Sequence, residues 1–300
     1  MPKPGKAILK KLRELLSKVP PTALLWAAAV LLAGVALVLG SRTVWRSIVR
    51  QPQFRVHALA IAPADYPEYI DGARMTQDVR SLLSRVPGDS SIFDKHLALA
   101  VQRQLRNCPW VLRVNSVHRE MPNSLEAGLV FRKPAGIVSM GGRQYMVDGQ
   151  GYWLPAKLFK RPREWRGQCL PLIVDRMLRT PPPVGQAWDG ARLAVGARLS
   201  EFFREKGVLK KLDLAVIDVT GVGRPNEPDV VLTTADGAQI KWGTSSVYSL
   251  VGGLPRPAFL VPDAEKLAML LSKLDDYPDL QGIKYVDLRF RGRVVFAEDN

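Results

Sequence analysis

The residues best suited to chemistry in this sequence are three histidines, two cysteines and one Ser/Thr-rich loop. His57, His96 and His118 are far apart and lack the spacing of metal ligands. The loop at residues 243–246 (G-T-S-S) offers hydroxyl nucleophiles, but no base is placed to activate them. The G-x-S-x-G, G-x-x-x-x-G-K and C-x-x-C motifs are absent. We therefore predict a protein that is not an enzyme, with no catalytic, cofactor-binding or metal-binding residues.

Cys108 and Cys169 are the two cysteines of the chain. Two cysteines are too few for a disulfide scaffold, although an oxidising external compartment would allow them to pair. Nothing in the sequence brings them together, and we expect two separate buried thiols.

Basic residues dominate the charge of the chain. Lys and Arg total 43 against 28 Asp and Glu, which gives a formal net charge of +15. Such a charge is compatible with nucleic-acid binding. However, the basic residues are dispersed, and the membrane topology derived below places most of them outside the cytoplasm. We therefore interpret the charge as a solvated basic surface near anionic lipid or wall polymer, and we predict no nucleic-acid partner.

One uncharged segment near the N-terminus runs from Val19 to Ser41. It offers about 20 apolar residues, the number that one helix needs to cross the hydrocarbon core of a membrane. Backbone polar groups in lipid must be satisfied within the segment, so it must be helical. We predict a transmembrane helix over residues 22–41, preceded by a basic cytoplasmic tail over residues 1–21.

The distribution of basic residues around this segment predicts its orientation. Six Lys and Arg precede it, and four follow closely, at positions 42, 46, 50 and 55. This bias favours a cytoplasmic N-terminus. A signal peptide cleaved after residues 38–40 (V-L-G) is the alternative, but the apolar core is longer than the usual signal-peptide core.

The first predicted folded unit covers residues 54–134, beyond a helical extension over residues 41–53. Strand-like alternation begins at Phe54–Leu59. Two helical stripes follow, formed by Met75, Val79, Leu82, Leu83 and Val86, and by Phe93, Leu97, Val101 and Leu105. Strands are expected at 111–119 and 125–131. The order β-α-α-β-β predicts a small α+β domain.

The second predicted unit covers residues 135–300 and is rich in strands. Asp-Gly turns at 148–149 and 236–237 each lie between two strand candidates. Two helices are expected, one with its apolar face at 191–203 and one capped by Asp263. The fold class predicted for the whole chain is α+β: a transmembrane helix, a small β-α-α-β-β domain, and a mixed β-rich domain with two helices.

The chain is predicted to end in two strands, Ile283–Arg289 and Arg293–Ala297, joined by a turn at residues 291–292. A terminal strand often lies at a sheet edge, with one side of its backbone unpaired. A partner strand can add at such an edge through main-chain hydrogen bonds.

Short motifs in the first unit resemble one known family. They are Pro109-Trp110-Val111, Val114, Val117-His118-Arg119, Pro122-Asn123-Ser124-Leu125 and Phe131-Arg132-Lys133-Pro134-Ala135. Their types and order resemble the POTRA domain of the FtsQ/DivIB cell-division family. Residues 120–122 (E-M-P) stand where that family has W-P, and residues 131–132 (F-R) stand where it has E-R.

Motifs in the second unit resemble the β domain of the same family. They are Asp148-Gly149-x-Gly151, Leu170-Pro171-Leu172-Ile173, Leu232–Gly243 and Tyr285-Val286-Asp287-Leu288-Arg289-Phe290. POTRA domains serve many assembly systems. The order of tail, single span, POTRA domain and β domain is therefore more specific than a POTRA match alone.

The resemblance implies a non-enzymatic cell-division scaffold in the inner (plasma) membrane, located at the division site. Its N-terminus would be cytoplasmic and its bulk periplasmic or extracellular. It implies FtsB-like and FtsL-like single-span coiled-coil proteins as partners, together with other division proteins that contact the POTRA domain.

The resemblance also implies which residues contact a partner. Arg289 and Phe290, on the predicted penultimate strand, match residues used in partner contact. The terminal strand would supply the pairing edge, through Arg293, Val294, Val295 and Phe296. A core position is the alternative for Phe290, because Val286 and Leu288 share its alternating face.

A POTRA-bearing envelope assembly or secretion factor is the alternative function. Such proteins usually carry a transmembrane barrel, built from many alternating strands of about 10 residues. The sequence after Gly151 is short and interrupted by helices, which disfavours a barrel.

Overall fold

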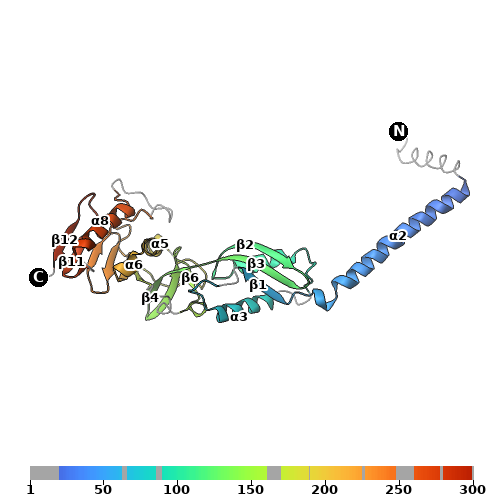
Figure 1. Ribbon diagram of the computed structural model, residues 1–300, viewed down its shortest axis with the longest axis horizontal. Helices are drawn as coiled ribbons and strands as arrows, with labels where there is room; N and C mark the ends of the chain where they lie inside the picture. Colours follow the sequence, from blue (N-terminus) through green and yellow to red (C-terminus); the bar gives the residue numbers. More distant parts are fainter. Residues whose placement is uncertain are drawn as a thin grey trace, which may run out of the picture.

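The structure, a computed structural model, describes residues 20–62, 66–85, 90–160, 170–188, 190–224, 227–247, 260–277 and 280–298. Figure 1 shows an elongated molecule with helix α2 (Pro21–Val49) at one end. Strands β11 (Ile283–Asp287) and β12 (Val295–Glu298) lie at the other end. The predicted basic tail and Cys169 lie outside the described residues.

Helix α2 is the one candidate membrane span among the described residues. Its segment Leu25–Val49 has a mean hydropathy of 1.9, and none of it is buried against the rest of the chain. Proline at the first helical position starts the helix without loss of a hydrogen bond. The hydroxyls of Ser41 and Thr43 donate to carbonyls one turn earlier, which satisfies them inside the helix. The predicted apolar helix is therefore present, and it continues into the predicted extension.

Aromatic side chains connect the end of α2 to the first folded unit. The rings of Trp45 and Phe93 have centroids 5.4 Å apart, and those of Phe54 and Phe93 are 5.1 Å apart. Phe54 belongs to a short 3-10 helix, η1 (Pro52–Phe54), and not to the strand predicted from residue 54, because Pro52 begins a helical turn there.

The first unit is a three-stranded sheet with two helices, in the predicted order β-α-α-β-β. Its elements are β1 (Ala58–Ala62), α3 (Gly72–Leu83), α4 (Leu97–Arg106), β2 (Val111–Glu120) and β3 (Ser124–Phe131). The strand order is β1-β3-β2, with β1 parallel and β2 antiparallel to β3. The helical stripes are buried as expected, with Met75 and Val79 on α3 and Val101 on α4 in the core.

The second unit is built on one nine-stranded sheet, in the order β12-β11-β10-β9-β8-β7-β4-β5-β6. Its other strands are β4 (Pro134–Met140), β5 (Arg143–Asp148), β6 (Trp153–Leu154), β7 (Leu172–Val174), β8 (Leu214–Asp218), β9 (Val231–Thr234) and β10 (Gln239–Lys241). Its helices are α5 (Ala191–Glu205), the short α6 (Val208–Lys211) and α8 (Asp263–Asp276), with the 3-10 turn η2 (Ala156–Leu158). The α+β class with few helices is confirmed.

Asp263 does not cap α8, contrary to the sequence prediction. Pro262 is the N-cap residue, and the buried Asp263 is the first helical residue. Its carboxylate accepts hydrogen bonds from Trp242 Nε1 at 2.7 Å and Ser245 Oγ at 2.6 Å. The loop after β10 packs against the start of α8, so these donors satisfy the carboxylate in place of the helix N–H groups. Ser245, in the Ser/Thr-rich loop at residues 243–246, is therefore a buried hydrogen-bond donor to Asp263.

The two units share a packed joint. Side chains after the first unit, including Leu154, Leu158 and Phe159, belong to the core of its helices and sheet. Beside them, the largely buried side chain of Arg132 pairs with the carboxylate of Asp148 at 2.5 Å. Asp148 also accepts the backbone N–H groups of residues 150 and 152, each at 2.9 Å. The Asp148-Gly149-x-Gly151 motif thus forms a turn whose aspartate binds Arg132, at the end of the first unit.

Candidate functional site

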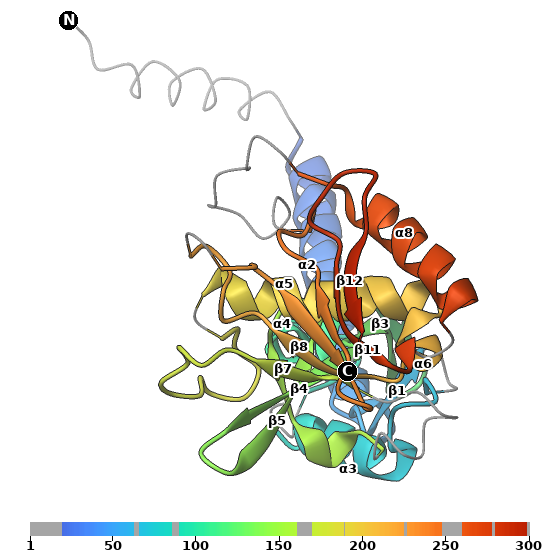
Figure 2. The ribbon, with the colours of Figure 1, turned by 90° about the vertical axis from the view of Figure 1, so that its left-hand side faces the viewer.

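The candidate site is the last edge of the nine-stranded sheet, which we call the C-terminal edge (residues 289–298). Strand β12 is at one end of the strand order and pairs with β11 alone. The register is antiparallel, with Val286 opposite Phe296 and Asp287 opposite Val295. On its other side, β12 has no neighbouring strand among the described residues (Figure 2). Its backbone can therefore accept one more strand there.

The opposite end of the sheet differs, because its edge is covered. The backbone of Trp153 on β6 accepts a hydrogen bond from Gly185 N at 2.8 Å and donates one to Gln186 O at 3.0 Å. The chain around residues 185–186 therefore occupies this edge in the way that natural proteins blunt exposed strands. Within the described residues, the open edge of this sheet is the one at β12.

Arg289 is held at the C-terminal edge by a bidentate contact with Asp287. Its Nε lies 2.9 Å from Asp287 Oδ1, and its Nη2 lies 2.7 Å from Asp287 Oδ2. Burial opposes ionisation of the Asp287 carboxyl, but the hydrogen bonds and charge of Arg289 outweigh burial and lower its pKa. The same hydrogen bond raises the pKa of Arg289. The guanidinium is thus fixed in one orientation beside the edge.

Gly243, after β10, provides the space in which Arg289 lies. Its φ is +72°, in the left-handed region that side chains disfavour. A Cβ at this position would lie 2.7 Å from Cγ of Arg289. The backbone of residue 243 and the stem of Arg289 are therefore in close contact, and a larger residue would displace one of them.

Two aromatic side chains are exposed at the C-terminal edge. Phe290 is 50% exposed and Phe296 is 38% exposed. The core position considered for Phe290 is therefore wrong, because the chain turns after β11 and removes residue 290 from the alternating face. The ring of Phe296 lies beside that of Tyr277, the residue that follows α8, with centroids 5.7 Å apart, and Nζ of Lys273 on α8 lies 5.6 Å from the Phe296 centroid.

The boundaries of the last two strands differ from the predicted ones. Strand β11 ends at Asp287, so Arg289 and Phe290 lie in the turn and not on the strand. Strand β12 begins at Val295, so Arg293 and Val294 precede it. The Arg293 N–H donates to the Phe290 carbonyl at 3.3 Å, which closes a turn that carries Gly292 at a φ of +63°. Val294 is half-buried and packs against the main core.

Several residues that shape the edge were not singled out from the sequence. Asp287 orients Arg289, and their closeness in sequence, with opposite charges two residues apart, was the available signal. Gly243, Lys273 and Tyr277 come from segments distant in sequence, and no local pattern links them to β12. Within the described ranges, no group of three His, Cys, Asp or Glu side chains could hold a metal ion.

No family model matches the chain. The chain is similar to the cell division protein FtsQ of Anaeromyxobacter sp. (strain K), with 33% identity over 141 residues. The aligned part is 47% of this chain and 41% of that protein, so the chain matches less than half of its relative's length. This similarity, together with the one candidate membrane helix among the described residues, fits an FtsQ/DivIB-like protein.

Proposed function

We propose that the protein is a non-enzymatic scaffold of the cell-division machinery, anchored in the inner membrane with its N-terminus in the cytoplasm. The similarity to a cell division protein supports a role in cell division, and the apolar helix α2 supports anchoring in a membrane. In this proposal the first unit is a POTRA domain that contacts other division proteins, and the second unit is the β domain. The protein would act at the division site.

The proposed binding mode is addition of a partner strand to β12. The observation that carries it is the open side of β12, next to the exposed rings of Phe290 and Phe296. Main-chain hydrogen bonds along β12 would provide affinity, and these rings would select the partner's side chains. Arg289, held by Asp287, would add a fixed cation beside the new strand. The partners in this proposal are FtsB-like and FtsL-like single-span proteins.

A pair of proline variants tests the strand addition. Adjacent residues of a strand direct their N–H groups to opposite sides, so Ala297→Pro and Glu298→Pro remove donors on different sides of β12. Neither variant removes a large apolar side chain. The proline whose nitrogen faces β11 removes a hydrogen bond between the strands, so this variant should melt at a lower temperature than wild type. The other variant should keep wild-type thermal stability, because prolines on the open side of an edge strand are tolerated. The stable variant should lose capture of an FtsB-like partner from detergent extracts by at least roughly tenfold, or about 1.4 kcal/mol.

The proposed strand addition is contradicted if the stable variant captures the partner as well as the wild type does.

The cellular role has a separate test. Depletion of the protein should produce filamentous cells, and a fluorescent fusion should concentrate at the septum. Normal division on depletion, with the fusion spread over the envelope, would exclude the division role.

A further inference from the structure

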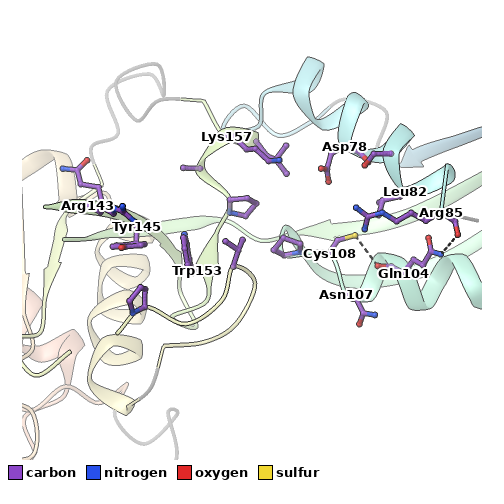
Figure 3. A pocket seen from close by; sticks show the side chains of 18 residues that line it. Asp78, Leu82, Arg85, Gln104, Asn107, Cys108, Arg143, Tyr145, Trp153 and Lys157 are labelled. Carbon is purple, nitrogen blue, oxygen red and sulfur yellow. Dashed lines mark hydrogen bonds between the residues drawn. The ribbon is translucent and has the colours of Figure 1, made fainter. Parts of the chain in front are cut away.

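A large cleft lies between the two units, distant in the fold from the C-terminal edge. Its volume is about 960 Å³. Helices α3 and α4 form one wall, with Asp78, Arg85 and Cys108. The opposite wall comes from the β4–β5 hairpin, β6 and η2, and it carries Arg143 and Lys157 (Figure 3). The strand addition proposed above does not use this cleft.

Contacts between the two walls fix the cleft before any ligand binds. The guanidinium of Arg74 on α3 donates to the carbonyl of Lys157 at 3.0 Å. The backbone N–H of Asp71 donates to the carbonyl of Leu158 at 3.0 Å, and the Leu158 side chain is buried in the core of the first unit. The cleft therefore has the preformed shape that is typical of ligand sites.

The charged side chains of the cleft are mostly basic. Arg85, Arg143 and Lys157 are exposed, and none of them forms an ion pair within the part of the chain that the structure describes. The carboxylate among the described lining residues is Asp78, which accepts a hydrogen bond from Trp110 Nε1 at 2.8 Å. The cleft thus presents three cations, none of them ion-paired within the described residues, against one carboxylate, and this excess of positive charge favours an anionic ligand.

The floor of the cleft is apolar. The half-buried ring of Trp153 packs edge to face with Tyr145, with centroids 5.0 Å apart. Val184, which also lines the cleft, is an exposed apolar side chain at 45% exposure. Apolar surface of this kind next to unpaired cations suits a ligand that carries both a hydrophobic group and carboxylates.

We propose that this cleft binds an extended acidic peptide segment of a partner protein. An apolar side chain of the peptide would pack on Trp153 and Val184, and flanking carboxylates would pair with Arg85, Arg143 and Lys157. A peptide fits better than an anionic polysaccharide, because the apolar floor offers few hydrogen-bond partners for sugar hydroxyls. This site and the strand addition at β12 are independent of each other.

Peptide selection on the full chain tests the proposal. A phage library of random dodecapeptides is panned against the protein held in lipid nanodiscs. We expect enrichment of sequences that combine Asp or Glu with an aromatic or aliphatic residue. A synthetic peptide from this set should bind Arg143→Glu roughly tenfold more weakly than wild type. This difference in affinity should be larger at low salt, where charges are less screened. Val184→Ser should weaken the same peptide without a change in salt dependence.

The matched control is Arg113→Glu, which reverses an exposed charge on β2, outside the cleft. It should leave peptide affinity unchanged, and all three variants should share the wild-type melting temperature. The proposal is overturned if the selected peptides show no acidic excess, or if they bind Arg143→Glu as tightly as wild type. Binding of polygalacturonate oligosaccharides that depends on Arg143, without peptide enrichment, would assign the cleft to a sugar polymer and would also overturn it.

Discussion

The carboxyl of Asp287 connects the core of the second unit to its C-terminal edge. Its side chain is buried, yet it remains ionised because Arg289 supplies two hydrogen bonds and an opposite charge. Arg289 in turn has one favourable position, over Gly243. A buried acid and an arginine two residues apart therefore act together with a glycine from a distant segment to place one cation beside β12.

Arg289→Gln should destabilise the protein at pH 7, because the Asp287 carboxylate loses its charged partner. The expected loss is only about 1–2 kcal/mol, because solvent already screens the partly exposed Arg289. The folded-state pKa of Asp287 is lowered, so the stabilising contribution of the pair is complete above the unfolded pKa, about 4. It is lost as the pH falls through the folded pKa. Denaturant melts of detergent-solubilised wild type and variant should therefore converge below about pH 4. Arg291→Gln, at an exposed ion pair of 3.6 Å, is the control and should change little.

Lys266 carries a buried amine with a different pH dependence. Its Nζ donates to the carbonyl of Thr244 at 2.5 Å and lies 3.9 Å from Asp263. Burial lowers its pKa to about 8, although Asp263 and Asp229 oppose the shift. Between this value and the unfolded pKa of about 10.4, the unfolded chain binds more protons than the folded one. Folding stability contributed by this group therefore rises with pH across that window.

Lys266→Met should remove this dependence and leave the fold intact, because the Asp263 carboxylate keeps its donors Trp242 and Ser245. From pH 7.5 to 10.5, the wild type should gain stability relative to the variant by an amount on the order of 3 kcal/mol. Chemical denaturation of both proteins across this range measures the difference. If the free energies of unfolding of the two proteins changed with pH in parallel, Lys266 would not be buried as a charged group.

Helices and strands with strong periodicity were predictable from the sequence. The stripes of α3 and α4 and the Asp-Gly turn between β9 and β10 needed only local patterns. Strand β4 was missed, because Pro134, Gly136 and small side chains conceal its alternation. However, the Gly-Gly pair that follows β4 is typical of a hairpin turn. Gly141 and Gly142 have φ values of +58° and +73° and join β4 to β5 as a two-residue hairpin loop.

The turn between β4 and β5 gives a matched pair of variants. Gly141→Val should destabilise the protein by about 1–2 kcal/mol, because a β-branched residue is strained in the left-handed region. Gly141→Asn should cost only a few tenths of a kcal/mol, since Asn tolerates this conformation. Thermal melts of the two variants provide the comparison. Equal melting temperatures would mean that this turn does not adopt a left-handed conformation.

The C-terminal edge was less predictable than the elements around it. The resemblance pointed to Arg289 and Phe290, and the order of the strands suggested an edge. The approach of Tyr277 and Lys273 to Phe296 depends on how α8 packs on the sheet. Such contacts arise from tertiary packing, which a single sequence does not encode in any local pattern.

The joint between the two units is both packed and charged. Asp148→Ala would leave the guanidinium of Arg132, whose side chain is 11% exposed, without its carboxylate. We expect a loss of about 3 kcal/mol and faster limited proteolysis between the units. The double variant Arg132→Met/Asp148→Ala should recover part of this loss, because no unpaired charge remains. A double variant that is less stable than Asp148→Ala would contradict the buried-pair account.

If β12 binds a partner as proposed, the elongated shape limits which partners can reach it. Helix α2 and β12 lie at opposite ends of the molecule, and Trp45 and Phe93 pack the helix end against the first unit. With α2 in the bilayer, β12 stands at a set height above the membrane surface. A partner anchored in the same membrane needs an external segment long enough to reach that height before its strand can pair. Under the proposed strand addition, the length of a partner's stalk would therefore contribute to its selection.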